Sequence, residues 1–396
     1  MMRLSLARRP SRPLTIESPE PLLAVGGARV VLGDHVDGNG LPLPLRPAPD
    51  TMFGPRGVCI AGRAPALFVA DTGHHRLMMW KNLPDQDNAP ADLVIGQTDF
   101  WREGRNARGA PGSATFNMPT GVASDGRVLV VADAWNHRVL IWRELPTINN
   151  QPADVVLGQA DFSGALANRG ADRLGPETLN WCYGATIADG RLFVADTGNR
   201  RVLVWNSLPR ENGQPADLAL GQSDMITRDD NAGIGAGAIG MRWPHSIVVD
   251  RGRIMVADAG NNRVMVWSHM PNADGAPCSF ALGQEDLFSI DHNRGQYNPN
   301  AKALNMPYGL AVMGDRLICA DTANSRLVGR RLAALGADTA ADALAGQDGL
   351  SIKGDNRWRR ATRDSLCWPF AIAAHGDLLA IADTGNNRVM LWGAAL

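Results

Sequence analysis

The sequence predicts an all-β protein, a six-bladed β-propeller made of four-stranded antiparallel blades. Three observations support this fold class. A short phrase recurs six times at a constant interval, each repeat holds four apolar runs of strand length, and no amphipathic run of helical length separates them. A repeated four-stranded antiparallel sheet is typical of a propeller.

The recurring phrase centres on an alanine–aspartate step. It reads VADTGNRRVLVW in the third unit and IADTGNNRVMLW near the end of the chain. Its aspartate is found at Asp71, Asp133, Asp196, Asp258, Asp321 and Asp383, so the period is 62 or 63 residues. This period covers most of the chain and predicts six blades.

Each unit holds its strands in a fixed order, which the third unit shows as GATIA, LFVAD, RVLVW and LALGQ. The turn between the second and third strands contains Gly and Asn, which tolerate positive φ, and an aspartate that can accept backbone N–H bonds. The arginine that follows can pair with the aspartate of its own or of the adjacent unit. We therefore interpret both residues as structural.

The last unit lacks its fourth strand. A glycine lies 25 residues after each of the first five aspartates, but after Asp383 it would fall at position 408, past Leu396. Because an open sheet leaves unpaired edge groups, we expect the run ARVVLGD, with Gly33, to complete the last blade and close the ring. Residues 1–21 fall outside the period and are expected to be a disordered or loosely attached tail, so that residues 22–396 form the propeller.

Composition sets broad limits on function. The 39 basic and 40 acidic residues nearly cancel, which predicts no general attraction to nucleic acid or anionic lipid. No apolar run reaches the roughly 18 residues of a membrane helix, and the N-terminus lacks the apolar region of a signal peptide. The five cysteines form no CxxC pair, as expected of free thiols in a reducing compartment. We therefore expect a cytoplasmic protein without membrane attachment.

The turns resemble those of the NHL-repeat family, whose repeats centre on D-x-x-N-x-R-[IV]. Asp196, Asn199, Arg201 and Val202 match this pattern, whereas the first unit departs from it with His74 and Leu77. The LGQxDF phrase at Gly158 to Phe162 is similar to that of bacterial NHL proteins without an assigned activity. The resemblance implies the propeller, and it implies several functions, among them protein binding, RNA binding, ligand sensing and a metal-dependent lyase.

In a propeller the first strands line the central channel, so the residues entering them form a ring at one mouth. We name this set the mouth ring; it lies 13 residues before each aspartate, or 15 in the first unit, and comprises Arg56, Thr120, Tyr183, His245, Tyr308 and Phe370. Two positions earlier stand large apolar residues, including Trp181, Trp243 and Trp368. This set predicts either a binding pocket or a plug of bulky side chains.

The interblade loops are expected on the same face as the mouth ring. The last loop combines Arg357, Trp358 and Arg359, a composition that suits base stacking and phosphate binding or a protein contact. The six loops together hold more acidic than basic residues, so nucleic acid is not the expected partner. The mouth ring contains one histidine and no carboxylate, which disfavours a zinc or calcium site.

The sequence therefore predicts a non-catalytic binding or scaffold protein, monomeric by itself, that recognises a protein or peptide with the face bearing the mouth ring and the long loops. It predicts no catalytic residue, no cofactor and no metal. A small-molecule-binding enzyme, a lyase or hydrolase acting at the same mouth, is the alternative, and RNA binding is a lesser one.

Overall fold

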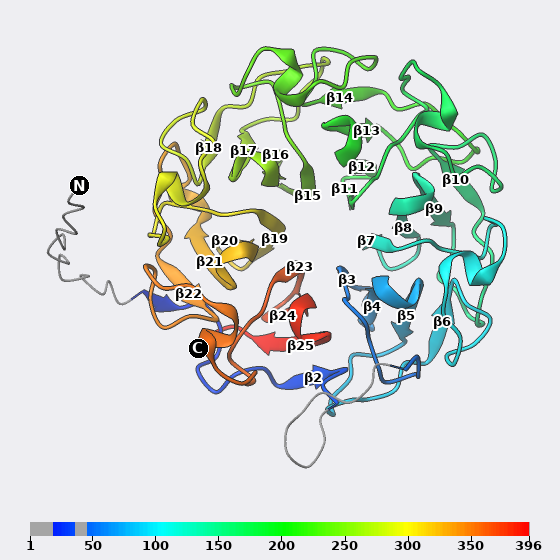
Figure 1. Ribbon diagram of the computed structural model, residues 1–396, viewed down its shortest axis with the longest axis horizontal. Helices are drawn as coiled ribbons and strands as arrows, with labels where there is room; N and C mark the ends of the chain where they lie inside the picture. Colours follow the sequence, from blue (N-terminus) through cyan, green and yellow to red (C-terminus); the bar gives the residue numbers. More distant parts are fainter. Residues whose placement is uncertain (1–18, 36–45, 396) are drawn as a thin grey trace, which may run out of the picture.

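The computed structural model describes residues 19–35 and 46–395, which form six sheets in a ring around a central channel (Figure 1). Each sheet is one blade, with its first strand at the channel and its fourth at the rim. Apart from strands, these residues form short 3₁₀ segments. The predicted six-bladed propeller is confirmed. No helix of this described part is long and apolar enough to cross a membrane.

Blades 1 to 5 each use four consecutive antiparallel strands. Blade 1 has β3 (Gly57–Ala61), β4 (Ala66–Asp71), β5 (Arg76–Trp80) and β6 (Leu93–Ile95); blade 2 has β7 (Pro119–Ser124), β8 (Leu129–Asp133), β9 (Arg138–Trp142) and β10 (Val155–Leu157); blade 3 has β11 (Gly184–Ala188), β12 (Arg191–Asp196), β13 (Arg201–Trp205) and β14 (Leu218–Leu220). Blade 4 has β15 (Pro244–Asp250), β16 (Arg253–Asp258), β17 (Arg263–Trp267) and β18 (Phe280–Leu282); blade 5 has β19 (Pro307–Met313), β20 (Arg316–Asp321), β21 (Arg326–Arg331) and β22 (Ala343–Ala345).

Blade 6 joins the two ends of the described chain. Its strands are β23 (Pro369–His375), β24 (Leu378–Asp383), β25 (Arg388–Gly393) and β2 (Val30–Leu32). Strand β2 runs antiparallel to β25, with Val31 opposite Met390. The prediction that an N-terminal strand completes the last blade is confirmed.

The predicted tail boundary at residue 21 falls inside an ordered strand. Residues 1–18 lie outside the described residues, but β1 (Glu20–Pro21) pairs in parallel with β22 of blade 5. The Leu22 N–H continues this pairing by donating to the Leu344 carbonyl at 3.0 Å. The N-terminal segment therefore contacts both blade 5 and blade 6.

Short 3₁₀ segments shape the mouth face, which we define as the face bearing the mouth ring. One set forms the turns between second and third strands: η1 (Thr72–His74), η3 (Ala134–Asn136), η5 (Thr197–Asn199), η7 (Ala259–Asn261), η9 (Thr322–Asn324) and η12 (Thr384–Asn386). A second set lies in the interblade loops: η2 (Arg105–Arg108), η4 (Ala167–Gly170), η6 (Asp230–Gly233), η8 (His292–Gly295) and η11 (Asp355–Trp358). One further segment, η10 (Leu332–Ala334), follows β21.

A buried aspartate–arginine pair holds each turn between second and third strands. In blade 3, Arg201 Nε donates to Asp196 Oδ2 at 2.8 Å, and neither side chain is exposed to solvent. The other carboxylate oxygen accepts the Asn180 backbone N–H at 2.7 Å, and Asn199 Nδ2 donates to Oδ2 at 2.8 Å. Equivalent pairs occupy the other five blades. The arginine thus pairs with the aspartate of its own unit, and both residues are structural.

The same arginine also fixes the neighbouring loops. Arg201 Nη2 donates to the Gly175 and Thr178 carbonyls, both at 3.0 Å, in the loop before the blade. Its Nη1 donates to the Met225 carbonyl at 2.5 Å in the loop after the blade. Asn168 of η4 joins this network by accepting from Asn199 Nδ2 at 2.8 Å. The loops before and after the blade are therefore held by hydrogen bonds to buried side chains.

Adjacent blades are joined at the rim by caps on the outer strands. The middle N–H of β10, from Val156, donates to Asn212 Oδ1 of blade 3 at 3.0 Å, and the Val156 carbonyl accepts the Gly213 N–H at 2.8 Å. Similar caps cover β2, β6 and β14. In blade 5, β1 takes this place. The outer edges of β2, β6, β10, β14 and β22 are therefore covered, which hinders pairing with another chain.

The tryptophans that end the third strands are core residues. Trp205 is 1% exposed, and its Nε1 donates to the Gln214 carbonyl at 3.1 Å. Blade 5 has Arg330 at this position, and that side chain is also buried, with its Nε donating to the Thr339 carbonyl at 3.0 Å. Arg330 therefore makes the same hydrogen bond as the tryptophans, to the carbonyl nine residues further along the chain.

Replacing the buried arginine should destabilise the fold strongly. Arg201→Met leaves the Asp196 carboxylate buried without its counter-ion, so we expect the free energy of unfolding to fall by about 3–5 kcal/mol. Arg127→Met is the matched control, because this side chain is 74% exposed and pairs with an equally exposed Glu144, and its loss should be below about 1 kcal/mol. Urea titration followed by tryptophan fluorescence measures both values, and equally small losses would refute a structural role for the pair.

Removing the closing strand should also lower stability. A chain starting at residue 34 loses the buried Val30, Val31 and Leu32, and we expect a melting temperature lower by about 10 °C or more. A chain starting at residue 19 keeps β1 and β2 and serves as the control. Differential scanning calorimetry compares the two chains, and equal melting temperatures would show that β2 does not close the ring.

Candidate functional site

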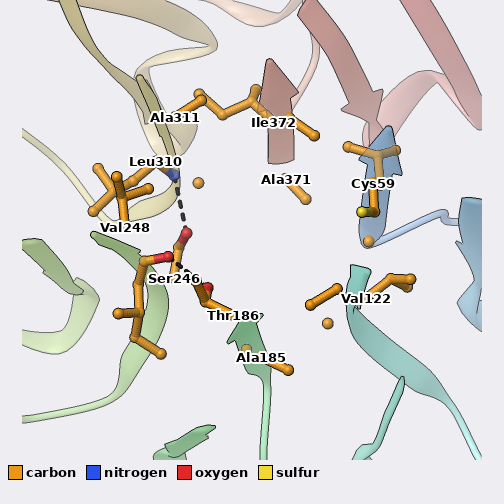
Figure 2. Close-up of a pocket in the computed structure, with 18 of the residues that line it drawn as sticks. Cys59, Val122, Ala185, Thr186, Ser246, Val248, Leu310, Ala311, Ala371 and Ile372 are labelled. Atoms are coloured by element: carbon orange, nitrogen blue, oxygen red, sulfur yellow. Dashed lines mark hydrogen bonds between the residues drawn. The ribbon is translucent and has the colours of Figure 1, made fainter. Parts of the chain in front are cut away.

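The inner strands bring most of the mouth ring to one end of the channel. The channel is a cavity of about 330 Å³ (Figure 2), and its lining includes Arg56, Tyr183, His245, Tyr308 and Phe370. Thr120 differs from the other members: it is 1% exposed, and its Oγ1 donates to the Cys182 carbonyl at 3.4 Å. Thr120 is therefore not available to a ligand at the mouth.

The other five members form a closed circle of contacts. Ring centroids lie 4.7 Å apart for Tyr183 and His245, 4.3 Å for His245 and Tyr308, and 4.3 Å for Tyr308 and Phe370. Arg56 completes the circle, since its guanidinium carbon lies 4.9 Å from the Phe370 centroid and its Nη1 donates to the Tyr183 hydroxyl at 3.0 Å. These side chains cover this end of the channel, which is the arrangement of the plug alternative.

The circle carries one positive charge at neutral pH. His245 Nδ1 lies 2.8 Å from the Trp243 carbonyl oxygen, which can only accept, so Nδ1 bears the proton and Nε2 is an acceptor. Burial, together with the nearby Arg56, lowers the pKa of His245 to about 4, and burial raises the pKa of Tyr308 to about 12. At pH 7 the imidazole and the phenol are neutral, and Arg56 remains charged.

The residues two positions before the mouth ring form an outer set of large side chains. They adopt the left-handed backbone conformation, with φ between +50° and +62°, at Met118, Trp181, Trp243, Met306 and Trp368. Blade 1 has Gly54 there, with φ of +55°. Glycine adopts this conformation at little cost, so the backbone alone does not require a large side chain. The three tryptophans are 37–40% exposed.

Side chains from the preceding blade hold this outer set in place. The Trp181 N–H donates to His137 Nδ1 at 2.9 Å, and the Met118 N–H donates to His75 Nδ1 at 3.0 Å. Burial lowers the pKa of both histidines, which keeps the accepting imidazoles neutral at pH 7. In blade 1, Asn387 plays the same part by accepting from the Gly54 N–H at 2.8 Å. The bonds pass from blade to blade and orient the outer set.

A tryptophan that the sequence analysis did not select extends the aromatic surface. Trp135 lies in η3, where the other turns have Gly or Ala, and it is 49% exposed. Its ring lies 6.5 Å from that of Trp181 in an edge-on arrangement, and Trp181 lies 5.3 Å from Tyr183. Comparing the six turns would have revealed Trp135, because it is the one large side chain at that position. An unbroken row of rings thus runs from Trp135 to Phe370.

Beside this row lies a groove of about 390 Å³. Its lining residues are Trp135, His137, Asn180, Trp181, Gly198, Arg200 and Trp243. Gly198 allows the η5 turn to lie directly against Asn180, because a Cβ there would lie 2.6 Å from the Asn180 carbonyl oxygen. Three half-exposed tryptophans from successive blades therefore surround one depression on the mouth face.

The polar groups at the groove are mainly donors. Because His137 Nδ1 accepts the Trp181 N–H, the neutral imidazole carries its proton on Nε2. Arg200 Nε donates to Asp230 Oδ1 at 2.6 Å, and the same carboxylate lies 3.4 Å from Arg242 Nε. Two guanidinium groups share one carboxylate here, which leaves a net positive charge at the rim.

The last interblade loop is separate from this row. Arg357 is held by Asp348 at 3.2 Å and Asp364 at 2.9 Å, so its charge is already paired. Trp358 is 74% exposed and Arg359 is also exposed. In the part of the chain that the structure describes, no ring contact joins Trp358 to the mouth ring. The predicted site residues therefore fall into two separate groups.

The placement of possible metal ligands also bears on the chemistry of the site. Over residues 19–35 and 46–395, no group of three or more His, Cys, Asp or Glu side chains is placed to hold a metal ion. The mouth ring supplies an aromatic surface, one guanidinium and three neutral polar groups, Tyr183, His245 and Tyr308. Such an arrangement can bind apolar and anionic groups.

Comparison with known proteins supports the repeat. The NHL repeat model matches residues 116–142, which run from just before β7 to the end of β9. Human NHL repeat-containing protein 2 is 34% identical over 95 residues, a match that covers 23% of this chain and 11% of the human protein. The chain thus spans about a tenth of the length of this relative.

Two solved structures are similar to this chain at low sequence identity. A protein of unknown function from Bacteroides thetaiotaomicron has a TM-score of 0.51 and 13% identity, with 87% of this chain and 70% of that chain covered. A hydrazine synthase chain of Kuenenia stuttgartiensis has a TM-score of 0.49 and 13% identity, with 91% and 99% covered. The chain therefore contains an NHL repeat over residues 116–142, and its six blades form a β-propeller.

Proposed function

We propose that this protein is a non-catalytic binding module that holds a peptide segment of a partner protein in the groove of Trp135, Trp181 and Trp243. One observation carries the proposal: three tryptophans, each 37–49% exposed, surround a single depression of about 390 Å³. Tryptophan is the residue most enriched at protein-binding hot spots, and clustered exposed aromatic side chains are uncommon elsewhere on protein surfaces. NHL propellers often bind proteins, which agrees with this use.

The backbone geometry supports a binding role for Trp181 and Trp243. Both adopt the left-handed conformation, which costs a non-glycine residue roughly 1–2 kcal/mol. Gly54 shows that a smaller residue suits the same backbone. Large side chains retained at a strained and exposed position are typical of functional sites.

The charges of the rim indicate the kind of segment that fits. Arg200, Arg242 and the His137 Nε2–H offer donors, with Asp230 as the one acidic partner. A segment with an aromatic or proline anchor next to a carboxylate would fill the apolar groove and pair with this rim. The mouth ring supports binding rather than catalysis, because Tyr183, His245 and Tyr308 are held in contact with one another.

The groove can be tested with substitutions that introduce the residue found at the equivalent position of another blade, because such residues suit the fold. Trp135→Ala copies Ala323 of blade 5, and Trp181→Met copies Met118 and Met306. A peptide selected from a displayed library on the native protein should bind the double variant at least about tenfold more weakly, as expected for two hot-spot residues. Fluorescence anisotropy with the labelled peptide measures both affinities.

Trp101→Ala is the control, because Trp101 is 70% exposed and lies outside the groove. This variant should bind the peptide as the native protein does, and thermal unfolding should confirm that all variants are folded. Unchanged affinity of the Trp135→Ala/Trp181→Met variant, or failure of the library to yield any peptide that competes for the groove, would contradict the proposal.

A further inference from the structure

We call the part of the channel below the mouth ring the tube; small residues form its first layer. That layer consists of Gly57, Gly121, Gly184, Ser246, Gly309 and Ala371. A Cβ on Gly184 would lie 1.8 Å from the His245 carbonyl oxygen, and one on Gly57 would lie 1.8 Å from that of Thr120. Neighbouring inner strands thus approach one another closely around a cavity of about 330 Å³.

The side chains along this tube are neutral and mostly apolar, while the inner strands, which are edge strands of their sheets, also present backbone groups to it. Every lining residue below the mouth ring is Gly, Ala, Val, Leu, Ile, Ser, Thr or Cys. Thr186 Oγ1 donates to the Ile247 carbonyl at 2.7 Å, and Ser246 Oγ accepts the Leu310 N–H at 3.1 Å, so both hydroxyls already bond to the wall (Figure 2). Burial raises the pKa of the Cys59 thiol to about 12, which keeps it uncharged.

A single cation stands at the ring end of this neutral tube. Arg56 Nη1 donates to the Tyr183 hydroxyl, while no carboxylate within residues 19–35 and 46–395 forms an ion pair with the guanidinium. A guanidinium bordering an apolar cavity is stabilised by an anion that can accept its remaining N–H groups. At the opposite end, Ile187, Val249 and Ala374 are half-buried, as expected where the tube reaches solvent.

We propose that the channel binds the carboxylate of an unbranched aliphatic acid, with the carboxylate on Arg56 and the alkyl chain along the tube. The four strand steps below the mouth ring span about 13 Å, the length of an extended chain of roughly ten carbon atoms. This site lies inside the channel, so it is independent of the tryptophan groove.

Probes of one length and different head groups test the proposal. Decanoate, decyltrimethylammonium and acetate are titrated into the full-length protein by isothermal calorimetry, below the concentrations at which micelles form. We expect saturable one-to-one binding of decanoate and at least roughly tenfold weaker binding of the other two, because each lacks either the anion or the chain. Equal binding of both long-chain probes would show an unspecific apolar surface and would overturn the proposal, as would the absence of decanoate binding.

Two variants locate the site. Arg56→Met removes the cation and keeps an unbranched side chain, and it should weaken decanoate binding roughly ten- to a hundredfold. Ala185→Leu fills the tube and should weaken it similarly, with circular dichroism as the check on folding. Arg127→Met, at an exposed arginine outside the channel, is the matched control and should bind decanoate normally. Native affinity in the folded Arg56→Met variant would refute the head-group position.

Discussion

Every blade depends on a carboxylate–guanidinium pair that is completely removed from solvent. Burying two charges is expensive, and the structure offsets that cost by supplying each oxygen and nitrogen with further partners. Asp196 accepts from the turn and from the strand entry, while Arg201 binds carbonyls of the loops on both sides of its blade. The pair therefore connects the sheet to chain segments that would otherwise be free loops.

This connection explains why long loops can carry a binding surface. The interblade loops run about 20 residues, yet η4 is tied to η5 through Asn168 and Asn199. The strand entries are tied to the preceding blade, as when His137 accepts from the Trp181 N–H. Side chains on such a framework are already oriented, which would reduce the entropy lost on binding the proposed peptide. The exposed tryptophans are the clearest example.

Repetition made the architecture predictable. A constant interval between aspartates defined six blades, and the lack of a fourth strand after Asp383 pointed to Gly33 and the closing strand. The mouth ring was found in the same way, since its positions are fixed relative to the aspartates. The sequence did not predict which aspartate each arginine pairs with. Asp and Arg recur at the same spacing in every unit, so only the three-dimensional structure shows that the pair forms within one blade.

Features that depart from the repeat were harder to foresee. Trp135 replaces a glycine in a turn, and its importance follows from its contact with Trp181 of the next blade. The circle of Arg56, Tyr183 and the other rings depends on side-chain rotamers across the channel, which no spacing encodes. Strand β1 has two residues and no pattern of its own; it forms because the outer edge of blade 5 is otherwise uncovered.

Site-resolved hydrogen exchange on the native protein tests the central role of the buried pairs most directly. The backbone N–H groups of Asn168, Asn180 and Trp181 donate to Leu179, Asp196 and His137, respectively, although all three lie outside strands. If the pairs fix the loops, these amides will exchange as slowly as those of strand β13. Exchange as fast as in an unstructured chain would show that the loops open independently of the sheets, and the account would fail.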